Sequence, residues 1–281
     1  MQNPTKKRER GFTLIELLIG MAISLVVVTA MSGVFISQRK TYAVQEQISE
    51  MQQNARAAMD IMSREIRMTG YGAPPTSNLS TWIAWVTSPA IDDNPKIVDG
   101  GGANPDEIYI VACFGGPVTT LSAAASAGDT TLSVEDAIKF NTNRKKVISI
   151  NGLENAVIKG ISGGTLTIDT DPTTTGNQGL TNSYASGASV CIVKVICYSI
   201  VEDTEGSNKI YTLKRNENLG AGRQPLAENI VDLQVTRSGS TIEIDPLIAQ
   251  TDKPDPDYSK NSGYRRYELR TFITPPNLLI N

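Results

Sequence analysis

RGFTLIELLIG, residues 10–20, is the stretch that decides the fold of this 281-residue chain. A basic residue precedes an apolar run, and one carboxylate, Glu16, interrupts that run. From Phe12 to Ile36 no other residue is ionisable, and a helix of this length at about 1.5 Å per residue covers roughly 37 Å, enough to cross a bilayer core. A charge inside such a run is costly unless it has a partner. We therefore predict a membrane-spanning helix over residues 12–36 in which Glu16 has a specific role.

The charges before the span predict its orientation. The basic residues there are Lys6, Lys7, Arg8 and Arg10. With Glu9 they give the first eleven residues a charge of +3, and since the whole chain carries −3, the remainder carries −6. The positive-inside rule keeps the basic end in the cytoplasm and sends the rest of the chain outward. An acidic remainder does not favour nucleic-acid binding, and no nucleic-acid partner is expected.

A second helical pattern follows the apolar run. Apolar residues recur at steps of three and four, at Val44, Ile48, Met51, Ala55, Met59, Met62 and Ile66. This spacing predicts one buried stripe on an amphipathic helix. We expect that half of the helix over residues 37–69, ended by Gly70 and by Pro74 and Pro75, with a globular domain covering the stripe.

The basic leader, the Gly11–Phe12 junction and Glu16 together resemble the class III signal of type IV pilins and type II secretion pseudopilins. The resemblance implies that prepilin peptidase removes a leader peptide of residues 1–11, cutting between Gly11 and Phe12, and that Phe12 is then N-methylated. It also implies that Glu16 pairs with the terminal amine of a neighbouring subunit during assembly. Two buried charges would then neutralise each other.

Two further segments resemble the PilW-type minor pilins: SREIRMTGYGAPP at 63–75 and LAENIVDLQV at 226–235. This resemblance implies a structural subunit that acts in pilus assembly or priming at or near the pilus tip, in twitching motility and adhesion. The implied partners are other major and minor pilins, prepilin peptidase, the inner-membrane assembly platform and membrane lipid. The implied location is the bacterial inner membrane, single-pass with a periplasmic C-terminal domain, and the pilus on the cell surface after assembly.

Residues 76–281 are expected to form a β-rich domain. Short alternating runs separated by turn residues predict strands at Glu107–Phe114, Ser189–Val201, Lys209–Arg215, Asn229–Thr236 and Tyr264–Thr274. Residues 118–187 are richer in Ser, Thr, Gly and Ala, and we expect a small inserted β-module there. The predicted fold class is α+β: a long N-terminal helix packed on an antiparallel β-sheet domain, the pilin fold, with that insertion.

The three cysteines allow one disulfide. Cys191 and Cys197 on one strand would lie about 20 Å apart, too far to bond. A disulfide would therefore join Cys113 to Cys191 or to Cys197, and both pairings stay open, as does the alternative that the chain forms no disulfide.

The sequence gives no catalytic residues and no cofactor. Histidine is absent from all 281 residues, which excludes Ser-His-Asp and Cys-His catalysis and most transition-metal sites. The acidic groups Asp252, Asp255 and Asp257, and Asp169 and Asp171, match no calcium loop, so no metal is expected. Gly100–Gly102 is interpreted as a flexible loop, and alternation explains Arg265, Arg266 and Arg270 as an exposed strand face. Trp82 and Trp85 fit packing residues as well as they fit a ligand platform.

Three other interpretations compete with a minor pilin. A minor pseudopilin of a type II secretion system carries the same peptidase motif. Ala30-Met31-Ser32 also fits the cleavage site of an ordinary signal peptide, which would release a secreted binding protein beginning at Gly33. A membrane-tethered hydrolase would need a carboxylate pair that no spacing singles out.

Overall fold

The structure, a computed structural model, describes residues 13–72, 94–102, 104–140, 147–171, 174–205, 208–217 and 222–278. The predictions for Gly11, Phe12, Trp82 and Trp85 lie outside these residues. The chain divides into two units, Met1–Ser49 and Glu50–Asn281, and each is described by itself.

One helix, α1, spans Leu14–Arg67. The sequence predicts the end of this helix correctly. Gly70 follows it with a φ of +77°, a left-handed conformation that residues with a side chain rarely adopt. In the second unit the helix buries one stripe, made of Met51, Ala55, Ala58, Met59, Met62 and Ile66. Five of these six residues belong to the predicted stripe, so the amphipathic pattern is confirmed from Met51 onward.

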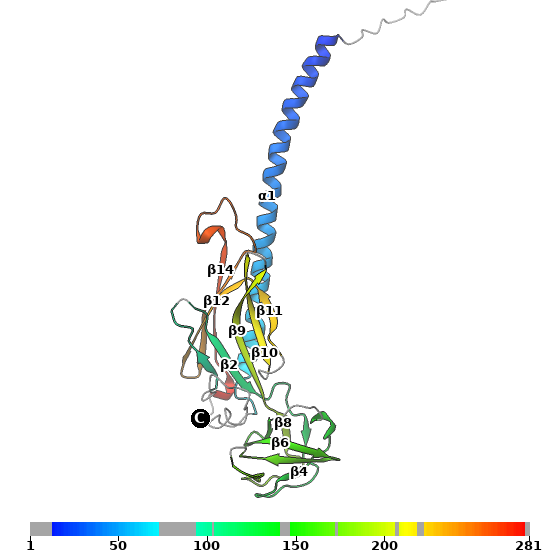
Figure 1. Cartoon of the computed structure of the whole chain (residues 1–281), viewed down its shortest axis with the longest axis vertical. Helices are drawn as coiled ribbons and strands as arrows, with labels where there is room; N and C mark the ends of the chain where they lie inside the picture. Colours follow the sequence, from blue (N-terminus) through cyan, green and yellow to red (C-terminus); the bar gives the residue numbers. More distant parts are fainter. Residues whose placement is uncertain are drawn as a thin grey trace, which may run out of the picture. The chain divides into compact units, whose positions relative to one another are not determined.

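Two antiparallel sheets lie beside the second half of α1 (Figure 1). The five-stranded sheet has the order β1-β2-β9-β10-β11, with bounds Lys96–Val98, Glu107–Ala112, Lys194–Glu205, Asn208–Glu217 and Gln224–Glu228. The three-stranded sheet has the order β12-β13-β14, with bounds Ile230–Ser238, Thr241–Gln250 and Arg266–Ile273. Short 3-10 helices lie at Ile138–Phe140, Asn261–Gly263 and Pro276–Leu278.

A buried carboxylate, Asp106, joins the two sheets. Its backbone N–H donates to the carbonyl of Leu233 at 2.7 Å, and its side chain accepts from the backbone N–H of Val235 at 2.7 Å and of Gly100 at 2.9 Å. Asp106 is 4% exposed. The hydrogen bonds satisfy a charge that would otherwise be costly to bury, so the loop before β2 is fixed against β12.

A third sheet of six strands lies between β2 and β9 in the chain. Its order is β3-β8-β5-β6-β7-β4, with bounds in chain order Thr119–Thr120, Thr131–Ser133, Val147–Ile150, Glu154–Ser162, Thr165–Asp169 and Ser189–Ile192. The two outer strands meet: Ser122 N donates to Ser133 O and Glu135 N to Thr120 O, both at 3.0 Å. The sheet therefore closes on itself, and we call it the barrel. Closure removes open strand edges.

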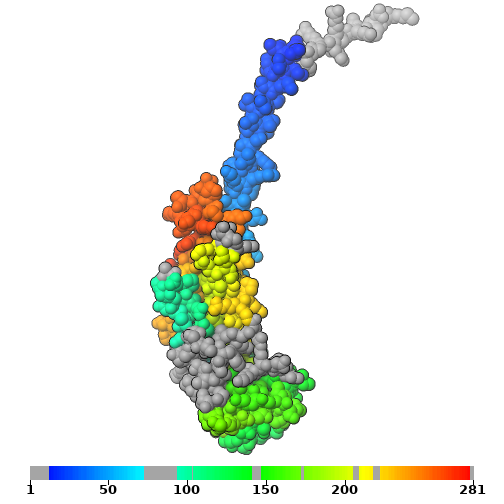
Figure 2. Space-filling view, viewed as in Figure 1, coloured from blue at the N-terminus to red at the C-terminus, as the bar shows by residue number. Residues whose placement is uncertain are grey.

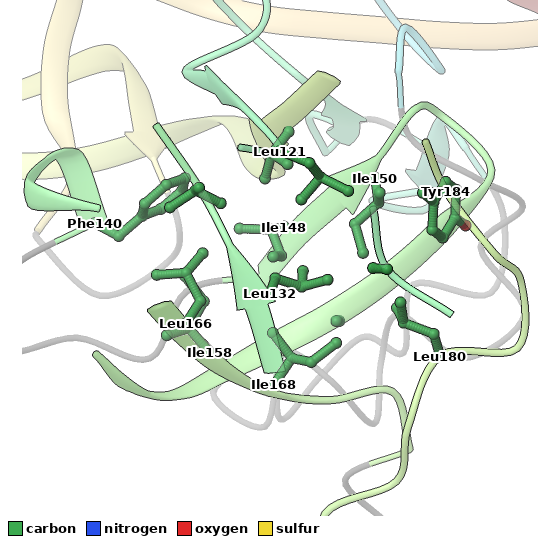
Figure 3. Packing of buried hydrophobic residues seen from close by; sticks show 14 of the residues in the cluster. Leu121, Leu132, Phe140, Ile148, Ile150, Ile158, Leu166, Ile168, Leu180 and Tyr184 are labelled. Atoms are coloured by element: carbon green, nitrogen blue, oxygen red, sulfur yellow. The ribbon is translucent and has the colours of Figure 1, made fainter. Parts of the chain in front are cut away.

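The barrel has a hydrophobic core of its own (Figure 3). Its buried members are all drawn from residues 121–190 and include Leu132, Phe140, Ile148, Ile168 and Leu180. A second cluster at the barrel's base contains Val147, Val157 and Cys191 from the barrel together with Val111 and Val195 from the five-stranded sheet. The barrel thus packs internally and touches the rest of the unit at one end.

These observations confirm the α+β class and correct two strand predictions. Ser189–Val201, expected as one strand, is divided at Val193 into β8 of the barrel and β9 of the five-stranded sheet. Nothing in the local sequence breaks the strand there, because the division is a change of pairing partner. The strand β13 was not predicted because Pro246 interrupts its pattern. The structure places Pro246 where the pairing shifts between Ile244 and Leu247, so its missing N–H removes no regular ladder bond.

Candidate functional site

The candidate assembly site begins at the first turn of α1. The backbone N–H and the hydroxyl of Thr13 donate to Glu16 Oε2 at 2.9 and 2.8 Å. The backbone N–H of Glu16 in turn donates to Thr13 Oγ1 at 3.3 Å. This reciprocal arrangement is a capping box, which satisfies N–H groups that a helix start leaves free. The Thr-x-x-Glu spacing that predicts a capping box is present in the sequence at residues 13–16, but the prediction for Glu16 did not include it.

The capping box does not use all of the carboxylate. Both bonds from Thr13 reach the same oxygen, Oε2, and an ionised carboxylate offers about four acceptor positions. A groove along the helix also begins at this residue, lined by Glu16, Leu17, Gly20, Met21, Ser24, Leu25 and Val28. Glu16 can therefore accept a further donor while it still caps α1.

The first half of α1 exposes its apolar side chains. Leu14 is 78% exposed and Val26 and Leu25 are each 69% exposed, and Figure 2 shows these turns (blue) with their side chains on the surface. An 18-residue window has a mean hydropathy of 2.4 and none of it is buried, so the helix is long and apolar enough to cross a membrane. Its hydroxyls bond within the helix: Ser24, Thr29 and Ser32 each donate to a carbonyl four residues earlier. The span thus presents few free polar groups to lipid.

A polar network joins the end of α1 to the five-stranded sheet. Glu65 accepts from Arg215 Nε at 3.0 Å and from Arg215 NH2 at 3.0 Å, and it also accepts from the Tyr198 hydroxyl. Arg215 NH1 reaches Glu217 at 3.2 Å, and Glu217 pairs with Lys194 at 2.8 Å. Burial, with the neighbouring Glu65 carboxylate adding to it, raises the pKa of Tyr198. The phenol therefore stays protonated as a donor and helps to fix the helix on the sheet.

The structure joins Cys113 and Cys191 in a disulfide. Cys197 is a buried free thiol, and burial raises its pKa to about 12. Tyr109 is paired with Cys197 across β2 and β9. Cys113 lies four residues further along the chain, just beyond the end of β2, and so about 13 Å from that position. The disulfide instead closes the loop that contains the barrel, with a separation of 78 positions between its ends.

The disulfide lies beside the turn that ends α1. A Cβ added to Gly72 would meet Cys113 Sγ at 3.1 Å and Cys191 Sγ at 3.5 Å, and one added to Gly152 would meet Gly72 Cα at 3.7 Å. The backbone N–H of Cys113 donates to Tyr71 O at 2.8 Å. Helix end, five-stranded sheet and barrel therefore meet at Gly72.

The other candidate residues have partners within the protein. Asp169 pairs with Lys159 at 3.0 Å, and Asp255 pairs with Arg265 at 2.7 Å. Arg270 pairs with Asp245 at 2.8 Å. Among the described residues, no group of three or more His, Cys, Asp or Glu side chains is arranged to hold a metal ion. Arg266 lies on the exposed face of β14, as its alternating pattern predicts.

Gly100 accepts no side chain in its present position. A Cβ there would lie 2.3 Å from the carbonyl oxygen of Pro105, whereas Gly101 and Gly102 face open space. Gly101 and Gly102 have φ values of +78° and +68°, which glycine adopts without strain. The three glycines therefore form a tight turn before β2.

Comparison with known families gives one match, to the prokaryotic N-terminal methylation motif, over residues 6–32. No curated protein and no solved structure matches the chain. The matched residues include the leader, the Gly11–Phe12 junction and Glu16, and they lead directly into the apolar half of α1. A prepilin-type signal implies processing by prepilin peptidase and assembly with other pilins. The methylation motif, the long apolar helix and the α+β fold together support a type IV pilin- or pseudopilin-like protein.

Proposed function

We propose that this chain is a minor type IV pilin of the PilW type, a structural subunit present at low copy number that primes pilus assembly. The observation that carries the proposal is a prepilin-type signal followed by one continuous helix whose second half is buried by a β-sheet domain. The proposal assigns the chain no catalytic activity. Its partners are other pilins and the inner-membrane assembly platform, and its β-rich domain faces the periplasm before assembly.

Glu16 is proposed as the assembly contact. Cleavage between Gly11 and Phe12 creates a cationic amine four residues before Glu16, in the region where the first turn of α1 exposes its N–H groups. Oε1 of Glu16, which the capping box does not use, accepts a hydrogen bond from the methylated amine of Phe12 in a neighbouring subunit. In lipid or in a filament core each charge is costly alone, so pairing favours assembly over the isolated subunit.

The position of the barrel supports a location of this subunit at or near the pilus tip. It meets the rest of its unit at Gly72, just beyond the last turn of α1, and its own core is complete. A domain placed beyond the helix end occupies space that a subunit stacked above it would need. A terminal position leaves that space free, which fits a low-copy priming subunit with roles in twitching motility and adhesion.

Deleting the gene and scoring two outputs tests the proposal. A minor pilin predicts loss of surface pili and of twitching, with secretion of exoproteins unchanged, and complementation restores both. Loss of exoprotein secretion with normal piliation would instead identify a pseudopilin of type II secretion. Mass spectrometry of the mature N-terminus gives a second test, since the proposal requires N-methylated Phe12, whereas a start at Gly33 would identify a secreted protein.

A further inference from the structure

Two basic residues lie just beyond the apolar run of α1. Arg39 and Lys40 come three and four residues after Ile36, where the apolar run ends, and both are exposed. Tyr42, two residues further on, is 68% exposed. A basic pair and an aromatic residue directly after a span of this kind match the composition of a membrane–water interface.

The position of the Arg39 guanidinium fits that boundary. It lies over the ring of Phe35, 4.5 Å from the ring centroid. Helical side chains lean toward the N-terminus of their helix, so the charge sits one turn back, beside the last aromatic residue of the apolar run. The Phe35 ring gives this charge a cation–π partner at the edge of the apolar run, so the level of Phe35 marks the boundary between the apolar core and the polar layer.

The described residues offer this pair no anion. No acidic side chain among them forms an ion pair with Arg39 or Lys40, and the next acid along the chain is Glu46. Arg64, in the second half of α1, does have a carboxylate partner, Asp60 at 2.7 Å. The two cations at the end of the span therefore remain available to an anion from outside the chain.

We propose that Arg39 and Lys40, with Tyr42 beside them, bind the phosphate groups of anionic phospholipids in the leaflet at the C-terminal end of the span. The guanidinium can bind a phosphate through two parallel hydrogen bonds, and the ammonium binds it as a point charge. The phenol of Tyr42 combines an apolar ring with a polar tip, which suits the headgroup layer.

This contact sets the depth of the helix. The Arg39 charge sits at the level of Phe35. Glu16 lies 19 residues before Phe35, about 29 Å along the helix, which matches a bilayer core about 30 Å thick. Holding Arg39 among the phosphates of one leaflet brings Glu16 to the opposite edge of the core. The capping box and the cleavage junction are then near the headgroups of the other leaflet. The proposal deepens the membrane contact of the proposed function and depends only on the helix lying in a bilayer.

Native mass spectrometry of the full chain in detergent tests the proposal. Phosphatidylglycerol or phosphatidylcholine is added, and the lipid molecules retained per chain are counted. We expect the unaltered chain to retain phosphatidylglycerol in preference. In R39Q/K40Q that preference should fall by about fivefold for each charge removed. The leader cations are kept in every variant, so their contribution to lipid retention is constant.

Two variants make the result specific. R39K/K40R keeps both charges and should retain phosphatidylglycerol as the unaltered chain does. R64Q/R67Q removes the same charge from exposed positions in the second unit and should have no effect. The proposal is overturned if R39Q/K40Q keeps the full preference, or if R64Q/R67Q loses as much of it. Neither result bears on whether the chain is a minor pilin, which the deletion experiment decides separately.

Discussion

Glu65 of α1 and Arg215 of β10 form a forked ion pair between helix and sheet. Both guanidinium contacts are 3.0 Å long, and the two side chains are 19% and 20% exposed. The residues are 150 positions apart in the chain, so the pair forms only when the sheet docks on the helix. Tyr198 donates to the same carboxylate, and the apolar stripe around Met62 and Ile66 supplies the adjacent buried surface. The network therefore fixes which turn of the helix meets which strand.

Replacing Glu65 should weaken this docking. Glu65→Gln leaves the guanidinium of Arg215 without its main carboxylate partner, and hydrogen bonds to charged groups contribute about 2 kcal/mol each. We expect the free energy of unfolding to fall by about 2 kcal/mol, measured by chemical denaturation followed by near-UV circular dichroism. The matched control is Asp60→Asn, which breaks the exposed pair with Arg64 and should cost well under 1 kcal/mol. Equal losses in the two variants would contradict a specific role for Glu65.

Glu154 gives the barrel a dependence on pH. Its side chain is buried and accepts bonds from Thr181, Asn182 and Tyr184. Burial alone would raise its pKa, but these donors, Thr181 foremost, outweigh burial and lower the pKa below the ordinary value of 4.5. A lowered pKa stabilises the fold above pH 4.5, and that stabilisation is lost as the pH falls through the folded-state pKa.

Glu154→Gln tests that dependence. The amide does not titrate, and its NH2 group is a donor that faces the donor groups of Thr181, Asn182 and Tyr184. At pH 7 we expect the variant to unfold at a lower denaturant concentration than the unaltered chain. The difference should shrink as the pH is lowered below 4.5. A difference that stays constant from pH 7 to pH 3 would show that Glu154 acts through packing alone.

The disulfide should stabilise the junction at Gly72. Cross-linking restricts the unfolded chain, and a disulfide typically contributes about 2–4 kcal/mol. Cys113→Ser with Cys191→Ser should lower the free energy of unfolding by that amount, whereas Cys197→Ala, which removes the buried free thiol, should cost about 1 kcal/mol. Denaturant titrations of the two variants provide the measurement. A larger loss from Cys197→Ala would reverse the assignment of roles.

Alkylation in denaturant without reductant checks the connectivity directly. Only Cys197 should be modified, and peptide mapping identifies it. Modification of Cys191 in place of Cys197 would assign the bridge to Cys113 and Cys197 and so contradict the structure.

Variants of Thr13 and Glu16 distinguish the role of Glu16 in helix capping from its proposed role in subunit assembly. Thr13→Val removes the side-chain cap and should cost the first turn of the helix about 1 kcal/mol, yet the subunit should still enter filaments because the carboxylate remains. Glu16→Ala should prevent incorporation. Immunoblots of sheared pili, normalised to membrane levels of the subunit, measure both. If Thr13→Val is excluded as strongly as Glu16→Ala, then Glu16 acts as a helix cap and the proposed contact with a neighbouring amine is wrong.

Periodic and local features were predictable from the sequence. The apolar run, its single acid and the stripe from Met51 to Ile66 predict a helix whose first half is exposed and whose second half is buried, because a spacing of three and four residues needs only helical geometry. The strands around Ile110, Leu213 and Leu233 were predictable for the same reason, since alternation is local. The apolar surroundings of Glu16 single it out in the sequence, but its hydrogen bonds with Thr13 were not predicted even though the capping-box spacing is present.

Pairing partners were not predictable. Strand β8 continues directly into β9, and only the change from β5 to β2 as partner separates the barrel from the five-stranded sheet. In the sequence, Pro246 predicts a break in a strand. In the structure, the strand continues through a register shift between Ile244 and Leu247, which contains Pro246.

The sequence by itself determined the long apolar helix, its charged start and the stripe that a domain must cover, since these depend on order and spacing along the chain. Tertiary structure alone decided that Cys113 bonds Cys191, that the inserted strands close into a barrel and that Glu65 meets Arg215. Each of these contacts joins residues distant in sequence, and the free energy that selects them comes from burying surfaces that exist only after the sheets have formed.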